Sequence, residues 1–309
     1  MNHPQLSVYL ATYTDGPNHD WPATLAMAQL MDEAGVDRVV ISDHVAFGEH
    51  FAAYGDPALG GTTGGRQPTG PDGAWLEPIA VLTAIAATTT RIRLGTSILL
   101  AALRRPAVLA KQLATLDVIS AGRLDVGVGV GWQREEYEAC GLSFEGRGRL
   151  LDHTLEVCTT LWTQQQASYD ETELSFDNIH QMPKPVQQGG VPLWISGTVN
   201  RNVARRLARF GSGWIPWGPD LTDLRGSIPA MKQALSDAGG DSSGLQVQGA
   251  VRVVRDGGDI DYRATVAAVP DLVEAGVTDF RIAAPLPTEH DRATEVLAQL
   301  VDAFRDVTR

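Results

Sequence analysis

The chain has 309 residues, a length typical of a single α/β barrel, and 43% of its residues are hydrophobic, enough for a globular core. Its formal net charge of −12 makes nucleic acid and anionic membranes poor partners. No apolar run approaches the ~20 residues of a membrane helix. The opening MNHPQLSVYLA lacks the order of a signal peptide, and Cys140 and Cys158 form no paired motif. These features predict one domain over residues 1–309 in a reducing cytoplasm.

The first elements expected along the chain are a strand, a helix and a second strand. Residues 5–11 alternate in hydrophobicity as a strand does. Asp20 is placed as an N-cap with Pro22 in the first turn, and Gly35 closes the helix that follows. The next run, 36–42, is almost continuously apolar, which is typical of a parallel strand covered on both faces.

The same strand–helix unit recurs along the chain, and residues 32–42 have a close echo at 273–283. The candidate strands are residues 5–11, 36–42, 91–98, 123–130, 192–196, 212–216, 245–254 and 277–283. Eight such units predict a (β/α)8 TIM barrel with its chemistry at the C-terminal ends of the strands. A doubly wound open sheet is the alternative, although no GxGxxG motif follows the first strand.

Two stretches fall outside this repeat. Residues 46–74 are rich in Gly, Pro and Thr, and a long loop directly after a strand end predicts a lid or binding loop. Residues 164–190 contain short alternating pieces that predict a small β insertion after the fourth helix.

The fourth predicted strand carries glycine at every other position. Asp125, Gly127, Gly129 and Gly131 share one face of it, since strand side chains alternate. Glycines on one face either leave room for a flat ligand against the backbone or let neighbouring elements pack closely. Both interpretations stay open from the sequence.

Several barrel chemistries lack their residues. None of the three lysines ends a predicted strand, which argues against a Schiff-base aldolase. The seven histidines are scattered and form no HxH motif, so no metal site is predicted. A GxSxG elbow is missing, and no pair of facing carboxylates favours a glycosidase.

The residues expected at the strand ends are small and polar, which suits a planar cofactor whose own ring does the redox work. His44 is the titratable group among them that changes charge near neutral pH. It is therefore the candidate catalytic residue, with a purely structural histidine as the alternative. The other residues are Asp43, Thr96, Ser97, Ile98, Val130, Gly131, Trp132, Ser196, Gly197 and Thr198.

These residues resemble the luciferase-like flavin and deazaflavin oxidoreductases, the family of bacterial luciferase. The matching pieces occur in family order over roughly the first 220 residues: ISDH at 41–44, LGTSIL at 94–99, GRLDVGVGVGWQREEYEACG at 122–141, MPKPVQ at 182–187, LWISGT at 193–198 and GSGWIPWG at 211–218.

The resemblance implies roles for particular residues. His44 would face the reacting edge of the cofactor ring as a proton donor or acceptor, and Asp43 would hold the cofactor or cap the loop. Ser97 and Ile98 would form a non-prolyl cis peptide behind the ring, beside Thr96 and the glycine face. The glycine-face contacts would be Gly129, Val130 and Gly131, and the phosphate site would comprise Ser196, Gly197, Thr198, Asn200 and Arg201, where an ordinary helix N-cap is the alternative.

One departure concerns the substrate. Relatives that oxidise sugar phosphates have a glutamate after the last glycine of the fourth strand, whereas this chain has Trp132, with Glu135 and Glu136 one helical turn on. This departure suggests a more apolar pocket, with Trp132 as one candidate pocket residue. Trp75 and Trp217 are the other candidates, and a place in the aromatic core is their alternative.

The segment GWQREEYEACG is the form associated with the branch that uses coenzyme F420, so F420 is the expected cofactor and FMN the alternative. The expected function is hydride transfer between F420 and a small organic substrate. Its alternatives are an FMN-dependent monooxygenase that uses O₂, and a non-catalytic flavin-binding partner subunit. A homodimer, and a separate reductase to recycle the cofactor, are the expected protein partners.

Overall fold

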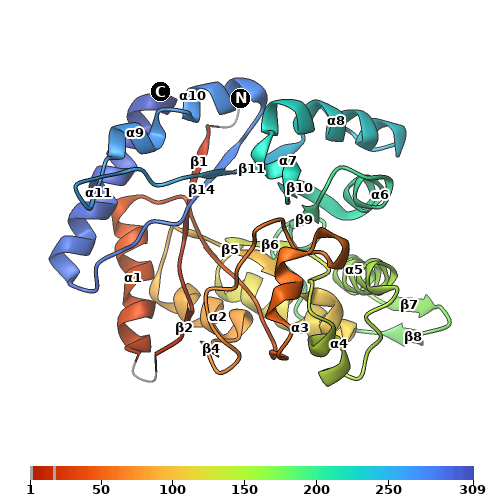
Figure 1. The fold of residues 1–309 in the computed structure, drawn as a ribbon. Helices are drawn as coiled ribbons and strands as arrows, with labels where there is room; N and C mark the ends of the chain where they lie inside the picture. The colour runs from red at the N-terminus through yellow and green to blue at the C-terminus, as the bar shows by residue number, and fades with distance from the viewer. Residues whose placement is uncertain (1–2, 17–18) are drawn as a thin grey trace.

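The structure is a computed structural model that describes residues 3–16 and 19–309. Within these ranges, eight parallel strands close into a barrel in the order β1-β14-β11-β10-β9-β6-β5-β3 (Figure 1). Their bounds are β1 Gln5–Tyr9, β3 Arg38–Ile41, β5 Arg93–Leu99, β6 Leu124–Val128, β9 Leu193–Gly197, β10 Gly211–Pro216, β11 Gln246–Val251 and β14 Asp279–Ile282. Each coincides with one of the predicted strands. The closed order confirms the (β/α)8 barrel and excludes the open sheet.

Helices connect the strands and cover the outside of the barrel (Figure 1). They are α1 Trp21–Ala34, α2 Pro78–Thr88, α3 Pro106–Ile119, α4 Arg134–Ala139, α5 Arg147–Thr163, α6 Arg201–Phe210, α7 Pro219–Thr222, α8 Leu224–Asp237, α9 Tyr262–Val266, α10 Val269–Ala275 and α11 His290–Thr308. The predicted caps of α1 are confirmed. The Asp20 carboxylate accepts from Ala23 N at 3.0 Å, and Gly35 is left-handed with φ of 86°. In the described ranges, none of these helices has the length and apolar character to cross a bilayer.

The two irregular stretches lie where the sequence places them. The 164–190 insertion forms an antiparallel hairpin of β7 Ala167–Asp170 and β8 Ser175–Ile179, which projects from the barrel after α5 (Figure 1). The 46–74 loop holds the short 3-10 helices η1 Phe51–Gly55 and η2 Pro57–Leu59. Smaller elements are β2 Tyr13–Thr14 paired with β4 Ala74–Trp75, η3 Ala101–Leu103, and β12 Arg255–Asp256 paired with β13 Asp259–Ile260.

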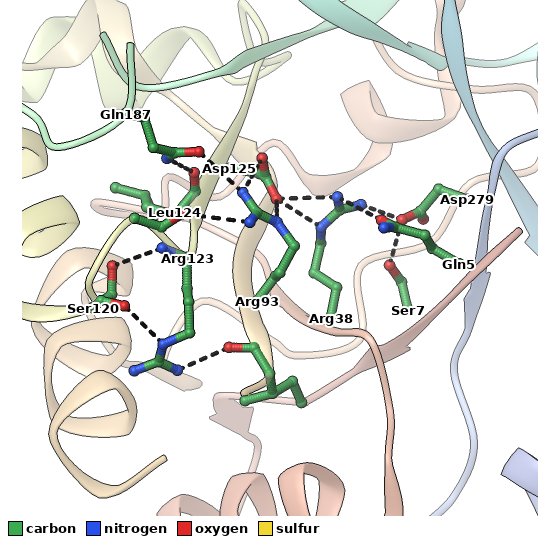
Figure 2. Close-up of polar contacts among 12 residues, drawn as sticks. Gln5, Ser7, Arg38, Arg93, Ser120, Arg123, Leu124, Asp125, Gln187 and Asp279 are labelled. Atoms are coloured by element: carbon green, nitrogen blue, oxygen red, sulfur yellow. Dashed lines mark hydrogen bonds and ion pairs between the residues drawn. The ribbon is translucent and has the colours of Figure 1, made fainter. Parts of the chain in front are cut away.

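Charged side chains close the barrel interior near the N-terminal ends of the strands. Arg38 lies between two carboxylates: its Nη2 is 3.0 Å from Asp125 Oδ2, and it also pairs with Asp279 (Figure 2). Arg93 Nε approaches the same Asp125 oxygen at 2.6 Å. Gln187, from the MPKPVQ piece, donates to the carbonyl oxygen of Leu124 at 2.7 Å. The network therefore joins strands across the barrel interior at the end opposite to the C-terminal ends of the strands.

Candidate functional site

A cavity of about 420 Å³ lies at the C-terminal ends of the barrel strands. Strand ends and the 46–74 loop both line it. The predicted site residues on its wall are Asp43, His44, Trp75, Ser97, Ile98, Gly129, Val130, Gly131, Trp132, Ser196, Gly197 and Trp217. Thr96, Thr198, Asn200 and Arg201 are not among the residues that line it.

His44 follows β3 and is held between two polar side chains. Its Nδ1 lies 3.2 Å from Oε2 of Glu136, and its Nε2 lies 3.3 Å from Nε2 of Gln67. Glu136 is 1% exposed, and its Oε1 accepts from the backbone N–H of Val45 at 2.7 Å. The Nδ1 contact has ion-pair distance without the alignment of a hydrogen bond. A buried carboxylate therefore stands directly behind the candidate catalytic imidazole.

Helix α4 delivers Glu136 and fastens the loop that follows β3. The Tyr137 hydroxyl donates to Val130 O at 2.6 Å, which ties α4 to the end of β6. Glu135 on the same helix pairs with His50, and Gln133 Nε2 donates to Gly48 O at 3.4 Å. The sequence places Glu136 one turn after the glycine face without assigning it a role. The available signal was the pair of consecutive glutamates, Glu135 and Glu136, shortly after the end of β6.

Asp43 binds the segment that follows β5. Its Oδ2 accepts from Leu100 N at 2.8 Å and from Arg104 Nη1 at 2.6 Å, and Arg104 Nη2 lies 3.1 Å from Oδ1. Both carboxylate oxygens are thus occupied by the protein, and Asp43 is 4% exposed. Of the two expected roles, capping the loop is the one that this geometry provides.

The floor of the cavity is mostly backbone. The Ser97–Ile98 peptide is cis, as the resemblance implies. A Cβ on Gly129 would lie 2.8 Å from Ile98 Cδ1, so this glycine lets two strands approach beneath the cavity. A Cβ on Gly127 would lie 2.2 Å from the carbonyl oxygen of Thr96. Close packing therefore explains Gly127, whereas Gly129 both packs closely and lines the cavity.

Thr96 does not belong to the cavity. Its hydroxyl donates to Gly127 O at 2.8 Å and the residue is 4% exposed. Side chains alternate along β5, so Thr96 points away from the interior that Ser97 faces. The Thr96 side chain is therefore not part of the cavity wall, and a cofactor contact of Thr96 stays a prediction.

The N-terminus of α6 is partly capped by the protein. Asn200 Oδ1 accepts from the N–H groups of Asn202 and Val203 at 2.9 and 3.0 Å, the ordinary N-cap that the sequence left as an alternative. Val199 N donates to the Asp220 carboxylate at 2.6 Å. The N-cap alternative is thus present in the structure, and the phosphate site at the start of α6 stays a prediction. Within the described ranges, the N–H groups of Thr198 and Arg201 have no acceptor.

Aromatic rings form the upper wall. The ring centroid of Trp75 lies 4.8 Å from that of His44 in an edge-on arrangement, and Trp132 lies 6.0 Å from it. Tyr54 packs 5.3 Å from Trp132. Trp217 Nε1 donates to Gly60 O at 3.2 Å, which joins the end of β10 to the 46–74 loop. The three predicted tryptophans therefore surround the same space as His44.

The cavity wall also contains Tyr9 and Arg281, which the sequence analysis did not single out. The Tyr9 hydroxyl lies 2.6 Å from Ser42 Oγ, and both residues line the cavity with Arg281 of β14. The available signal for Arg281 was a second charged residue, two positions after Asp279, in the strand predicted at 277–283.

Comparisons with known proteins identify relatives of this chain by sequence. A protein of Mycobacterium tuberculosis without an assigned function is 32% identical over 225 residues, which covers 72% of this chain and 74% of that protein. The F420-dependent glucose-6-phosphate dehydrogenase of Nocardia farcinica is 30% identical over 194 residues, covering 61% of this chain and 51% of that enzyme.

Among solved structures, an F420-dependent secondary alcohol dehydrogenase in complex with an F420–acetone adduct superposes with a TM-score of 0.73 at 18% identity, covering 99% of this chain and 100% of that one. This likeness concerns the fold. The family model described as luciferase-like monooxygenase matches residues 5–302, nearly the whole chain. The chain therefore belongs to the luciferase-like monooxygenase family.

Proposed function

We propose that this protein is an oxidoreductase that transfers hydride between coenzyme F420 and a small organic substrate, with His44 as its proton-handling residue. The observation that carries the proposal is the placement of His44. Its imidazole faces the cavity at the C-terminal strand ends, with the buried Glu136 carboxylate 3.2 Å behind it. That is the face on which barrels of this kind carry their active sites.

The cavity suits a flat ring bound against backbone. Its floor is made by Ser97–Ile98 and Gly129–Gly131, where a Cβ at Gly129 or Gly131 would lie 2.8 Å from a neighbouring side-chain carbon. His44 Nδ1 is a buried polar atom without an aligned hydrogen bond, and Ser97 and Ser196 add hydroxyl groups to the wall. When bound, a deazaflavin accepts or donates the hydride, and the chain provides shape, hydrogen bonds and exclusion of water.

His44 would move the proton that accompanies hydride transfer. The Glu136 carboxylate lies on the Nδ1 side of the imidazole, which leaves Nε2 for the cavity. Gln67 is an uncharged neighbour of Nε2, so it can turn to donate or accept as the imidazole changes protonation.

The similarity to F420-dependent glucose-6-phosphate dehydrogenases favours F420 as the cofactor. The position that holds Trp132 argues against a sugar phosphate as substrate, since a bulky apolar ring that is 6% exposed occupies it. The apolar upper wall favours a substrate with a hydrophobic body.

The test is a titration of the purified protein with F420 and with FMN, each oxidised and reduced, followed by absorbance and fluorescence. We expect spectral change and saturable binding with F420, and weaker binding with FMN. Selective binding of reduced FMN would contradict the F420 proposal. It would favour the second candidate, an FMN-dependent monooxygenase, to which the description of the matching family points. No affinity for either cofactor would favour the non-catalytic partner subunit.

A further inference from the structure

We propose that Arg281 binds a carboxylate group of the substrate, so that the substrate is a small organic acid with an apolar body. This inference rests on the proposed function and names the substrate class of the same site. Arg281 belongs to β14 and lines the cavity that His44 faces. Among the described residues that line this cavity, it is the one guanidinium or ammonium group.

Arg281 has no ion-pair or hydrogen-bond partner among the residues that the structure describes. In residues 3–16 and 19–309, no carboxylate lies within ion-pair distance of its guanidinium and no hydrogen bond is made by it. The nearest acid along its strand, Asp279, is already engaged, because its oxygens accept from Ser7 at 2.8 Å and Gln248 at 3.1 Å and pair with Arg38 (Figure 2). Arg281 is therefore a half-buried charge without an ion pair or hydrogen bond in the described ranges. The nearby Asp279 carboxylate favours its charged form but is shared with other groups.

The phenols in the same cavity do not neutralise it. Burial raises the pKa of Tyr9 and the pKa of Tyr54, so both remain uncharged at neutral pH. Burial also lowers the pKa of Arg281, but a guanidinium keeps its proton in proteins. A half-buried guanidinium that faces the cavity and has no ion pair in the described ranges can bind an anionic ligand directly.

The strand order places Arg281 on the substrate side of the cavity. In the closed barrel, β14 lies four strands away from β6 in either direction, which is diametrically opposite. Gly129 and Gly131 follow β6, and the proposed ring-binding floor is built there. A ring on that floor and an anion at Arg281 would therefore occupy opposite walls.

The chemistry of a single arginine favours a carboxylate. Its planar fork pairs with the two oxygens of a carboxylate in a bidentate arrangement. A phosphate dianion is usually met by more than one cation, and the described part of the wall offers none besides Arg281. Trp75, Trp132 and Tyr54 then supply apolar surface for the rest of the molecule.

The experiment compares binding of 3-phenylpropanoate with its neutral amide, 3-phenylpropanamide, by calorimetric titration. It uses the wild-type protein with and without bound cofactor, and Arg281→Met and Arg255→Met variants. Arg255 is exposed and lies outside this cavity, so it serves as the matched control. We expect the wild type and Arg255→Met to bind the carboxylate at least tenfold more tightly than the amide. Arg281→Met should bind both equally, while its cofactor affinity and melting temperature do not fall.

Three outcomes would overturn the inference. They are equal binding of the two probes by the wild type, a preference for the carboxylate that survives in Arg281→Met, and a loss of cofactor affinity or thermal stability in that variant. The last would make Arg281 a cofactor or structural residue. A preference for the carboxylate that depends on Arg281, in protein that binds neither F420 nor FMN, would support the anion site while contradicting the proposed function.

Discussion

His44 illustrates how one residue depends on three different segments. β3 places it at the cavity, α4 supplies Glu136 behind it, and the 46–74 loop supplies Gln67 in front. Its ring also packs edge-on against Trp75. The imidazole therefore has neighbours from three segments and still faces the cavity, as the proposed proton transfer requires.

His44→Ala should lower turnover by ~10²–10⁴, the usual cost of a lost general acid or base. Cofactor affinity should fall much less, because the backbone floor remains. Glu136→Gln should lower turnover by ~10–10²-fold, since a hydrogen bond or ion pair to a charged group contributes about 1.5–3 kcal/mol and each 1.36 kcal/mol is tenfold in rate. Steady-state kinetics on the cofactor-loaded protein, together with cofactor titration, measure both.

Glu135→Gln is the matched control for the Glu136 variant. It removes a carboxylate from the same helix, but that carboxylate pairs with the exposed His50 and does not line the cavity. Its turnover should stay within about threefold of the wild type, since exposed ion pairs contribute little. If Glu136→Gln behaved in the same way, His44 would not depend on its buried partner.

The N-terminus of α6 attracts anions, but protein side chains already accept from several N–H groups there. The first-turn N–H groups and the helix dipole attract an anion. Asn200 already caps two of those N–H groups, and the Asp220 carboxylate accepts from Val199 N at 2.6 Å. A cofactor phosphate at Gly197 and Thr198 would therefore meet a neighbouring negative charge.

Asp220→Asn should strengthen cofactor binding by about 3–10-fold, or ~0.7–1.4 kcal/mol, because it removes a like charge from the proposed phosphate site. Thr198→Asp should weaken binding by more than about tenfold, since it adds one. Thr198→Val, which changes the side chain without adding charge, is the control. Affinities of all three variants within about threefold of the wild type would mean that the phosphate binds elsewhere.

At the scale of the whole molecule, the charged network at the base of the barrel joins strands that are distant in sequence. Arg38 is 3% exposed and links Asp125 of β6 with Asp279 of β14, which lie across the barrel from each other (Figure 2). Its guanidinium also lies 4.9 Å from the ring centroid of Trp194. The network therefore cross-links strands on opposite sides of the barrel, below the cavity.

Arg38→Met should lower the free energy of unfolding by ~3–5 kcal/mol, because it leaves buried carboxylates without their shared cation. Arg225→Met is the control, since its pair with Asp271 is exposed and should contribute less than ~1 kcal/mol. Urea unfolding followed by tryptophan fluorescence measures both. A decrease of less than about 1 kcal/mol in the free energy of unfolding of Arg38→Met would show that the charged network does not stabilise the barrel.

The positions and chain order of the strands and helices could be predicted from the sequence alone. Hydrophobic periodicity, the Asp20 and Gly35 caps and the breaks at 46–74 and 164–190 are local signals, and each one acts within a few residues. The repeated unit then left the closed barrel as the favoured arrangement, and the strand-end motifs placed His44 and three tryptophans at one cavity.

The hydrogen-bond and ion-pair partners of those residues follow from the tertiary structure and cannot be read from the sequence. Glu136 lies 92 positions after His44, and Asp43 meets Arg104 from the following unit, so no local pattern reveals either pair. Thr96 and Ser97 are neighbours in sequence, yet the alternation of the strand sends only Ser97 to the cavity. The sequence shows Arg281 close to Asp279 but does not show that Asp279 is already bound to Arg38 from another strand. Side-chain pairing depends on barrel closure and register, and these are set by the packing of the whole chain.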